Sequence, residues 1–191
     1  AGYVTSTNFP LLNPLGGAYF QGVIINWQDA FILKFNNAGV PVWATFCGGN
    51  GFDFATSVCV DPSGDIFIGG ITDTSNFPLF NPLGGAYFQN SSGGGQEAFI
   101  AKFSNAGVPI WGTYYGGSGN ETLYSMCTDF SGNLFVAGYT SSTNMPVLLP
   151  AQSTNAGGFD IFVLSFSNVG VPLWATYYGG IGGELAYSIC C

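Results

Sequence analysis

Acidic side chains are the residues of this chain whose type and spacing best suit chemistry. Three of them end the pattern Gly-Gly-x-Gly-x-Asp/Glu, at Asp53, Glu121 and Glu184. Carboxylates and loop carbonyls are the hard oxygen donors that Ca²⁺ prefers, so these three acids are candidate calcium ligands. In the alternative interpretation, which we favour, the same carboxylates accept backbone N–H hydrogen bonds and fix turns.

The spacing of the acids suits a scaffold better than an active site. Eight of the ten acidic residues recur in phase, one per repeat, whereas glycosidase chemistry needs two acids across a single cleft. The chain has no His, so neither a Ser-His-Asp nor a Cys-His arrangement can form. We therefore expect no enzyme and, calcium apart, no cofactor.

The charge of the chain restricts its partners. The formal net charge is −8, and Lys34 and Lys102 are the only cationic side chains. Such a chain cannot neutralise a phosphate backbone, so we expect no nucleic-acid binding. Every apolar run is broken by Gly, Pro or Asn well before the roughly 18 residues that a spanning helix requires, so we expect no membrane insertion.

The five cysteines fall into two groups. Cys59, Cys127 and Cys190 occupy the same place in successive repeats, and we expect them to be buried free thiols, because packed sheets lie about 10 Å apart and a disulfide needs Cα atoms within about 7 Å. Cys47 and Cys191 depart from the repeat. In an oxidising compartment these two are the candidates for a disulfide, within one chain or between chains.

The aromatic residues also allow two interpretations. Trp43, Trp111 and Trp174 recur in phase, which favours packing between repeats over a sugar-binding platform. The near-identical segments 14–21 and 82–89 lie outside the predicted hairpins, so they are better candidates for recognition, for example of a glycan.

An internal repeat must position all these residues. The tryptophans lie 68 and then 63 residues apart, and a loop that is shorter by five residues explains the second value. Four strand-like runs per period, such as 55–61, 65–72, 97–103 and 108–115, flank turns rich in Gly, Asn and Asp. The sequence predicts an all-β fold of tandem four-stranded antiparallel blades of the β-propeller type. The approximate repeats are 1–54, 55–122 and 123–185, with 186–191 starting another blade.

Several motifs resemble the SBBP family, a β-propeller repeat of secreted and surface proteins of bacteria and archaea. They are Trp-x-Thr-Tyr-Tyr-Gly-Gly at 111–117 and 174–180, Asp-x-Ser-Gly-Asn/Asp at 61 and 129, Gly-x-Thr-x-Ser-x-Asn-Phe-Pro at 70–78 and Glu-Ala-Phe-Ile-Ala-Lys-Phe at 97–103. The resemblance covers nearly the whole chain. It implies a fold and an extracellular or cell-surface location, but no catalytic residues.

The phase of the repeat places the two chain ends in one hairpin of a split blade. Because a bare strand edge seeks a partner, we expect the last strand of one copy to pair with the first strand of another. The expected interface comprises Gly2, Tyr3, Val4 and Thr5 together with Leu185, Tyr187, Ile189 and Cys191. The alternative is that neighbouring blades of a longer protein supply the missing strands. The leading hypothesis is a subunit of an extracellular filament or surface assembly of identical copies, and the second is a surface adhesin or carbohydrate-binding propeller.

Overall fold

The computed structural model describes residues 1–81 and 84–191, and the described chain is all-β. Its strands form three antiparallel sheets. The first contains β1 (Gly2–Val4), β2 (Asp29–Phe35) and β3 (Pro41–Cys47). The second contains β4 (Asp53–Val60), β5 (Ile66–Thr72), β6 (Glu97–Phe103) and β7 (Pro109–Tyr115). The third contains β8 (Glu121–Thr128), β9 (Leu134–Thr140), β10 (Asp160–Phe166) and β11 (Pro172–Tyr178).

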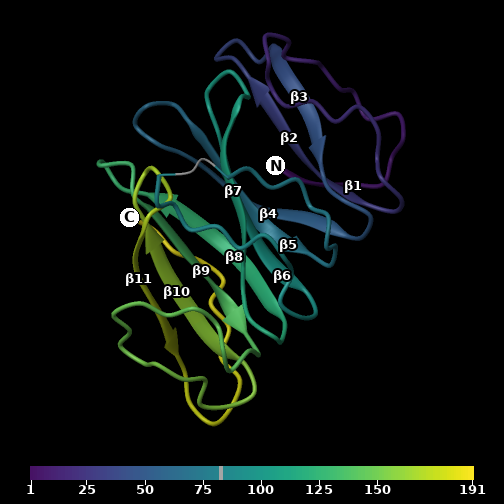
Figure 1. Cartoon of the computed structure of the whole chain (residues 1–191). Coiled ribbons are helices and arrows are strands. Elements are labelled where there is room, and N and C mark those ends of the chain that lie inside the picture. Colours follow the sequence, from purple (N-terminus) through teal and green to yellow (C-terminus); the bar gives the residue numbers. More distant parts are fainter. Residues whose placement is uncertain (82–83) are drawn as a thin grey trace.

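Each sheet is a blade, and the three blades fan out side by side, as Figure 1 shows. In the two complete blades the strand order is β4-β5-β6-β7 and β8-β9-β10-β11, so β4 and β8 are the inner strands. The first blade has the order β1-β2-β3 and lacks an inner strand. The predicted fold class is confirmed, and the strands of the second blade lie within two residues of the predicted bounds. Among the described residues, no helix is long and apolar enough to cross a membrane.

Turn chemistry explains why these short runs form hairpins. Oδ1 of Asp61 accepts hydrogen bonds from the N–H groups of Ser63 (2.9 Å) and Asp65 (3.0 Å), and Gly64 supplies the positive φ of +83° that the turn requires. Asp129 fixes the equivalent turn between β8 and β9 in the same way. The sequence therefore encodes each inner hairpin locally.

The inner strands carry a β-bulge at the same place in both complete blades. The register shifts between Ala55 and Ser57 in β4, and between Leu123 and Ser125 in β8. The bulge presses a carbonyl of the inner strand against a glycine of the next strand. A Cβ at Gly70 would overlap the carbonyl oxygen of Phe54, and one at Gly138 would overlap that of Thr122. Only glycine fits opposite the bulge.

The core lies in the seams between neighbouring blades. Trp111 of β7 packs edge to face on Phe166 of β10, with ring centroids 5.0 Å apart. Loops also cross the seams. The N–H of Tyr19 donates to the carbonyl of Gly107 (2.9 Å), and that of Tyr87 donates to Gly170 (2.9 Å). The corresponding segment of the third blade, between Leu148 and Gln152, is five residues shorter.

Candidate functional site

The first seam contains a groove where an inner strand would lie. This groove has a volume of about 320 Å³ and is lined by residues that include Ala1, Val58, Val60 and Ile66. Val58 is 46% exposed, whereas Met126, which has the same place in β8, is 6% exposed because sheet 2 covers it. The groove is therefore the part of the first blade that its missing inner strand would fill.

Gly2 of β1 lies at the edge of this groove and matches Gly70 and Gly138 in the repeat. Those two glycines face the bulge of an inner strand, but a Cβ at Gly2 would meet only the Phe31 ring, at 3.0 Å. The first blade thus keeps the glycine that a bulged partner needs, although no such partner is present. The sequence signal for this role was the glycine in phase at 2, 70 and 138.

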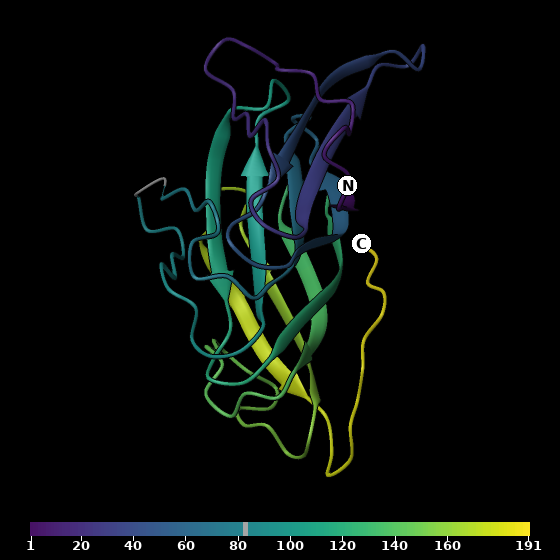
Figure 2. The same cartoon turned by 90° about the vertical axis from the view of Figure 1, so that its right-hand side faces the viewer.

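The C-terminal tail, defined as residues 184–191, occupies the position of an inner strand beside the third blade. The N–H of Glu184 donates to the carbonyl of Phe159 (2.8 Å), as that of Glu121 does to Gln96 (2.7 Å). The N–H of Ile189 donates to Ser125 Oγ at 3.3 Å, repeating the bond from Met126 to Ser57 Oγ at 3.0 Å. Figure 2 shows the tail running apart from the sheets, on the side where both termini lie.

The tail is therefore an inner strand without a sheet. The last strand that the sequence predicts, which includes Leu185, Tyr187, Ile189 and Cys191, has no strand pairing in the structure. An extended segment needs a hydrogen-bonded neighbour to count as a strand, and the chain itself offers none at this place. The predicted contribution of these residues to an interface between copies stays a prediction.

The predicted disulfide between Cys47 and Cys191 is wrong. Cys191 instead forms a disulfide with Cys127, whose Cα atom lies 5.9 Å away, and Cys47 is a buried free thiol in β3. The expectation that Cys127 is a free thiol is wrong for the same reason. Inner strands of adjacent blades approach one another much more closely than stacked sheets do, which the argument from sheet spacing overlooked. Cys59 and Cys190 are free as predicted, but they are not buried, because Cys59 is half-buried and Cys190 is exposed.

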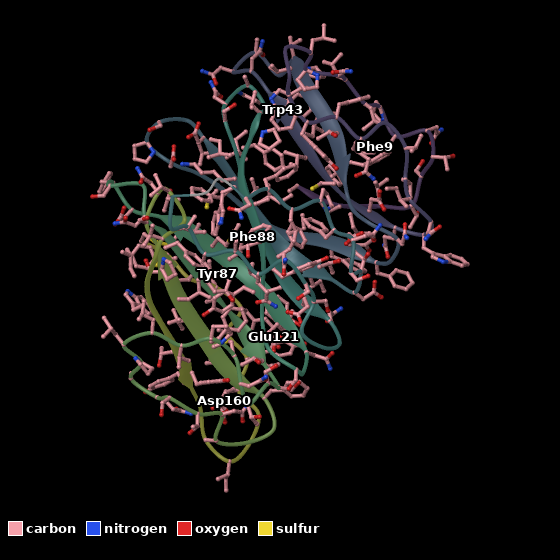
Figure 3. The ribbon with its side chains drawn as sticks, viewed as in Figure 1. Phe9, Trp43, Tyr87, Phe88, Glu121 and Asp160 are labelled. Atoms are coloured by element: carbon pink, nitrogen blue, oxygen red, sulfur yellow. A yellow bond between two sulfur atoms is a disulfide. The ribbon has the colours of Figure 1, made fainter. Side chains whose placement is uncertain are left out.

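The two outward faces of the fan carry matching aromatic residues. On sheet 3, Trp174 is half-buried, whereas Trp43 and Trp111 are buried by the following blade. On sheet 1, Phe35 is 51% exposed, whereas Phe166, with the same place in the repeat, is 1% exposed against the preceding blade. Figure 3 shows Trp43 near the upper end of the molecule, where sheet 1 meets sheet 2.

A pair of acids lies at each of the two seams between blades, and a third pair lies between the third blade and the tail. All of these acids except Glu184 are buried. One acid starts the third strand of a blade, and the other starts the inner strand that follows. The pairs are Asp29 with Asp53, Glu97 with Glu121, and Asp160 with Glu184. Glu121 and Asp160 are labelled in Figure 3, toward the lower ends of their strands.

Backbone hydrogen bonds hold every one of these six acids in the same way. Each accepts the N–H of the residue four positions earlier, at 2.6 to 3.1 Å. The interpretation that Asp53, Glu121 and Glu184 fix turns is thereby confirmed. Sequence analysis did not foresee that each has a second acid beside it, although the first acids also recur in phase.

Charge accumulates at these seams without a neighbouring cation. Burial, with a further contribution from the nearby charge of Glu121, raises the pKa of Glu97 to about 7. Burial and the nearby charge of Asp29 likewise raise the pKa of Asp53 to about 6. Two negative charges about 4 Å apart repel by roughly 4 kcal/mol at an effective dielectric constant of about 20. A positive charge at the seam would remove this repulsion.

Neither lysine can supply that charge. Lys102 forms ion pairs with Asp61 (2.9 Å) and Asp65 (3.3 Å), and Lys34 donates to the carbonyl of Asn105 (2.8 Å). No group of three metal-ligating side chains occurs in the described part of the chain, since the acids come two at a time. Calcium binding at Asp53, Glu121 and Glu184 stays a prediction.

The aromatic residues mainly pack the seams. Trp43 and Trp111 are buried, which confirms packing over a sugar platform for these two. Of the predicted recognition loops, residues 14–21 and 84–89 lie at the seams, and Pro82 and Leu83 lie outside the described residues. Glycan binding by these loops stays a prediction.

Two comparisons with known proteins bear on this geometry. The chain is 23% identical over 170 residues to an uncharacterized WD repeat-containing protein of Acanthamoeba polyphaga mimivirus, a match that covers 83% of this chain and 12% of that protein. The chain thus spans only a small part of this relative. Residues 110–146, from β7 through the segment after β9, match the model of the SBBP beta-propeller repeat. Residues 110–146 are thus similar to an SBBP-type β-propeller repeat, which agrees with the three fanned blades.

Proposed function

We propose that the chain is a structural building block whose copies join head to tail by completing a shared blade. The tail of one copy lies in the groove beside β1 of the next and becomes the inner strand of its first blade. The observation that carries this proposal is that the tail contacts β8 through the same kind of bond by which β8 contacts β4. A strand already held in the inner position needs only a sheet to join.

The internal blades define the register of the joint. Ala55 pairs with Gly70 and Ser57 with Gly69, and the third blade repeats this arrangement. Ala186 therefore lies opposite Gly2 of the next copy, and Ser188 lies opposite Ala1. The bulge at Tyr187 then meets the glycine in β1, which supports strand exchange by β-augmentation.

The outward faces support the same joint. Trp174 of one copy meets Phe35 of the next, as Trp111 meets Phe166 within the chain. Burial of the remaining exposed surface of these two half-buried aromatic side chains adds roughly 0.8–1.5 kcal/mol for each, about half the value for full burial. If the rotation that relates successive copies brings the last copy back to the first, the copies form a closed ring. Otherwise they form a filament.

We further propose that these assemblies are extracellular or lie on a cell surface and have no catalytic role. The disulfide between Cys127 and Cys191 supports an oxidising compartment. Glycan binding is the alternative function. The tyrosine hydroxyls nearest the apolar groove beside Trp174 already bind protein groups, since Tyr87 donates to Gln89 and Tyr115 donates to the carbonyl of Pro146. The donor hydrogens of these hydroxyls are therefore already used within the protein, which favours the structural role.

The substitution Gly2→Ala tests the joint. In the isolated chain the added methyl group meets only the Phe31 ring, so the fold should survive. In the joint, the added methyl group would overlap a carbonyl oxygen of the incoming tail, just as a Cβ at Gly70 would overlap the carbonyl oxygen of Phe54. Assembly should therefore be lost. Sedimentation velocity and electron microscopy of the purified chain measure this. Gly22→Ala is the matched control, because its methyl group would likewise meet only a phenylalanine ring, that of Phe20 at 3.1 Å.

Deleting residues 185–191 provides a second test. The deletion should abolish assembly and leave most of the chain folded. Cys191→Ser separates loss of the strand from loss of the disulfide. If the wild-type chain is monomeric at every concentration, or if Gly2→Ala assembles as the wild type does, the proposal is wrong. A chain that remains monomeric until preceding blades are attached to it would instead identify neighbouring repeats as the natural partner of β1.

A further inference from the structure

We propose that the seam between the second and third blades is a proton-binding site, in which Glu97 is protonated and donates a hydrogen bond to Glu121. Asp29 and Asp53 form the equivalent pair at the first seam, and we propose that they share one proton. This inference is independent of whether copies assemble. It concerns a buried site that repeats within a single chain.

The hydrogen bonds assign the protonated acid in the second seam. In the first seam, Oδ1 of Asp29 and Oδ1 of Asp53 both lack a partner, so either acid can carry the proton. In the second seam, Oε1 of Glu97 accepts the N–H groups of Gly93 (2.6 Å) and Gly94 (3.1 Å), while its buried Oε2 has no partner. Glu121 is the better hydrogen-bond acceptor of the two, because its carboxylate already accepts hydrogen bonds from the N–H of Gly117 (3.0 Å) and from two hydroxyl groups. A proton on Oε2 of Glu97 would satisfy the one atom that lacks a partner.

The geometry aims the unpartnered oxygen at the second acid. A Cβ at Gly116 would overlap Oε2 of both Glu97 and Glu121, so the two oxygens lie against the same Cα atom. The first seam repeats this arrangement at Gly48, and the third blade and the tail repeat it at Gly179. In both, the unpartnered Oδ1 of the first acid and the oxygen of the second that accepts the backbone N–H lie beside the glycine.

No other group facing the pairs removes their charge. Asp73 adds negative charge near Asp53. Tyr19, Tyr114 and the Cys47 thiol face the first pair, and the pKa values of all three are raised by burial and further by the nearby acids, so they stay neutral. Tyr87 faces Glu97, and burial together with the charge of Glu97 raises its pKa to about 12. Tyr177 faces Glu121 and Asp160, and its pKa is likewise raised by burial and these charges.

A shared proton makes stability depend on pH in a defined direction. An acid whose pKa is raised in the folded state stabilises the fold fully below its unfolded pKa, which is 4.5 for Glu97. That stability is lost as the pH rises through the folded pKa of about 7. Between these values the folding equilibrium constant should fall by up to about tenfold per pH unit for one shared proton.

The substitution Glu97→Gln tests the assignment. The amide imitates the protonated acid and donates to Glu121 at every pH, so the variant should be at least as stable as the wild type at about pH 8 and should show a shallower pH dependence. Denaturant unfolding followed by tryptophan fluorescence measures both. The infrared carbonyl band of protonated carboxyl groups near neutral pH should weaken in the variant. Asp129→Asn, which alters an acid outside every pair, is the control and should leave this band unchanged.

Two results would overturn the proposal. One is a Glu97→Gln variant that is less stable than the wild type at every pH and keeps its infrared band, which would make the acid a carboxylate in the folded protein. The other is a wild-type chain that loses its pH dependence when Ca²⁺ is added and recovers it with a chelator. In that case a divalent cation, and not a proton, neutralises the pairs.

Discussion

The two seams within the chain differ in one strand, and that difference shows how much the inner strand contributes. In the second seam, β4 and β8 lie together and Met126 is buried between blades. In the first seam β4 has no inner neighbour, Val58 is exposed and a groove remains. The outer strands and crossing loops are nevertheless alike in both seams. The outer parts of neighbouring blades therefore dock without the inner strand. The inner strand is needed to fill the groove at the centre of the fan.

The largest expected effect distinguishes buried from half-buried tryptophan. Trp111→Ala should lower the free energy of unfolding by roughly 3–5 kcal/mol, because it leaves a cavity against Phe166 and Gly170. Trp174→Ala, at the same place on the open face, should cost about 1 kcal/mol or less. Denaturant unfolding of both variants checks the comparison. Equal losses would mean that the outward face of sheet 3 is already covered.

The two lysines provide a smaller contrast between the seams. Lys102 is buried and pairs with Asp61 and Asp65, whereas Lys34 meets only neutral groups of Asn105. Lys102→Met should destabilise the chain by about 3 kcal/mol, because it leaves a buried carboxylate without its partner. Lys34→Met should change stability by less than about 1 kcal/mol.

The loss of stability at low pH provides a second test of the contrast between the two lysines. Burial acts to raise the pKa of Asp61, but the net shift is downward because Lys102 and backbone N–H groups donate to its carboxylate. Stability from Asp61 is therefore present above its unfolded pKa of 3.8 and lost as the pH falls below it. Lys102→Met should reduce the loss of stability at low pH, whereas Lys34→Met should leave this loss unchanged. An unaltered loss of stability at low pH in Lys102→Met would contradict the ion pair.

The smallest effect concerns the tail alone. Cys191→Ser should free residues 185–191 and weaken their attachment by roughly 2 kcal/mol, while the three sheets keep their stability. Limited proteolysis followed by mass spectrometry should then detect cleavage within the tail. Cys190→Ser is the control, since Cys190 is free and exposed. A tail that resists cleavage in Cys191→Ser would show that Glu184 and Ile189 suffice to hold it.

The sequence predicted the blades well because their signals are local. The Asp-x-Ser-Gly turns and the glycines in phase determine where each hairpin turns, and these recur with every repeat. The buried place of Trp43 and Trp111 followed from the same recurrence.

The sequence could not predict contacts that depend on how closely blades approach. The disulfide partner of Cys191 depends on the distance between inner strands, which repeat phase does not contain. The pairing of Glu97 with Glu121 likewise joins the ends of strands in different blades. In both cases the residue types were noticed and the partner was missed, because the partner lies across a seam.

The shortened loop after Leu148 has a consequence for any joint made on that side of the molecule. Tyr19 and Tyr87 each reach across a seam and bind the turn of the following blade, but three residues between Leu148 and Gln152 are too few to do so. A joint between copies would lack this hydrogen bond between the loop of one blade and the turn of the next. It would depend on the inner strand and the sheet faces alone. Assemblies of this chain should therefore come apart first between copies, releasing intact subunits that can join again.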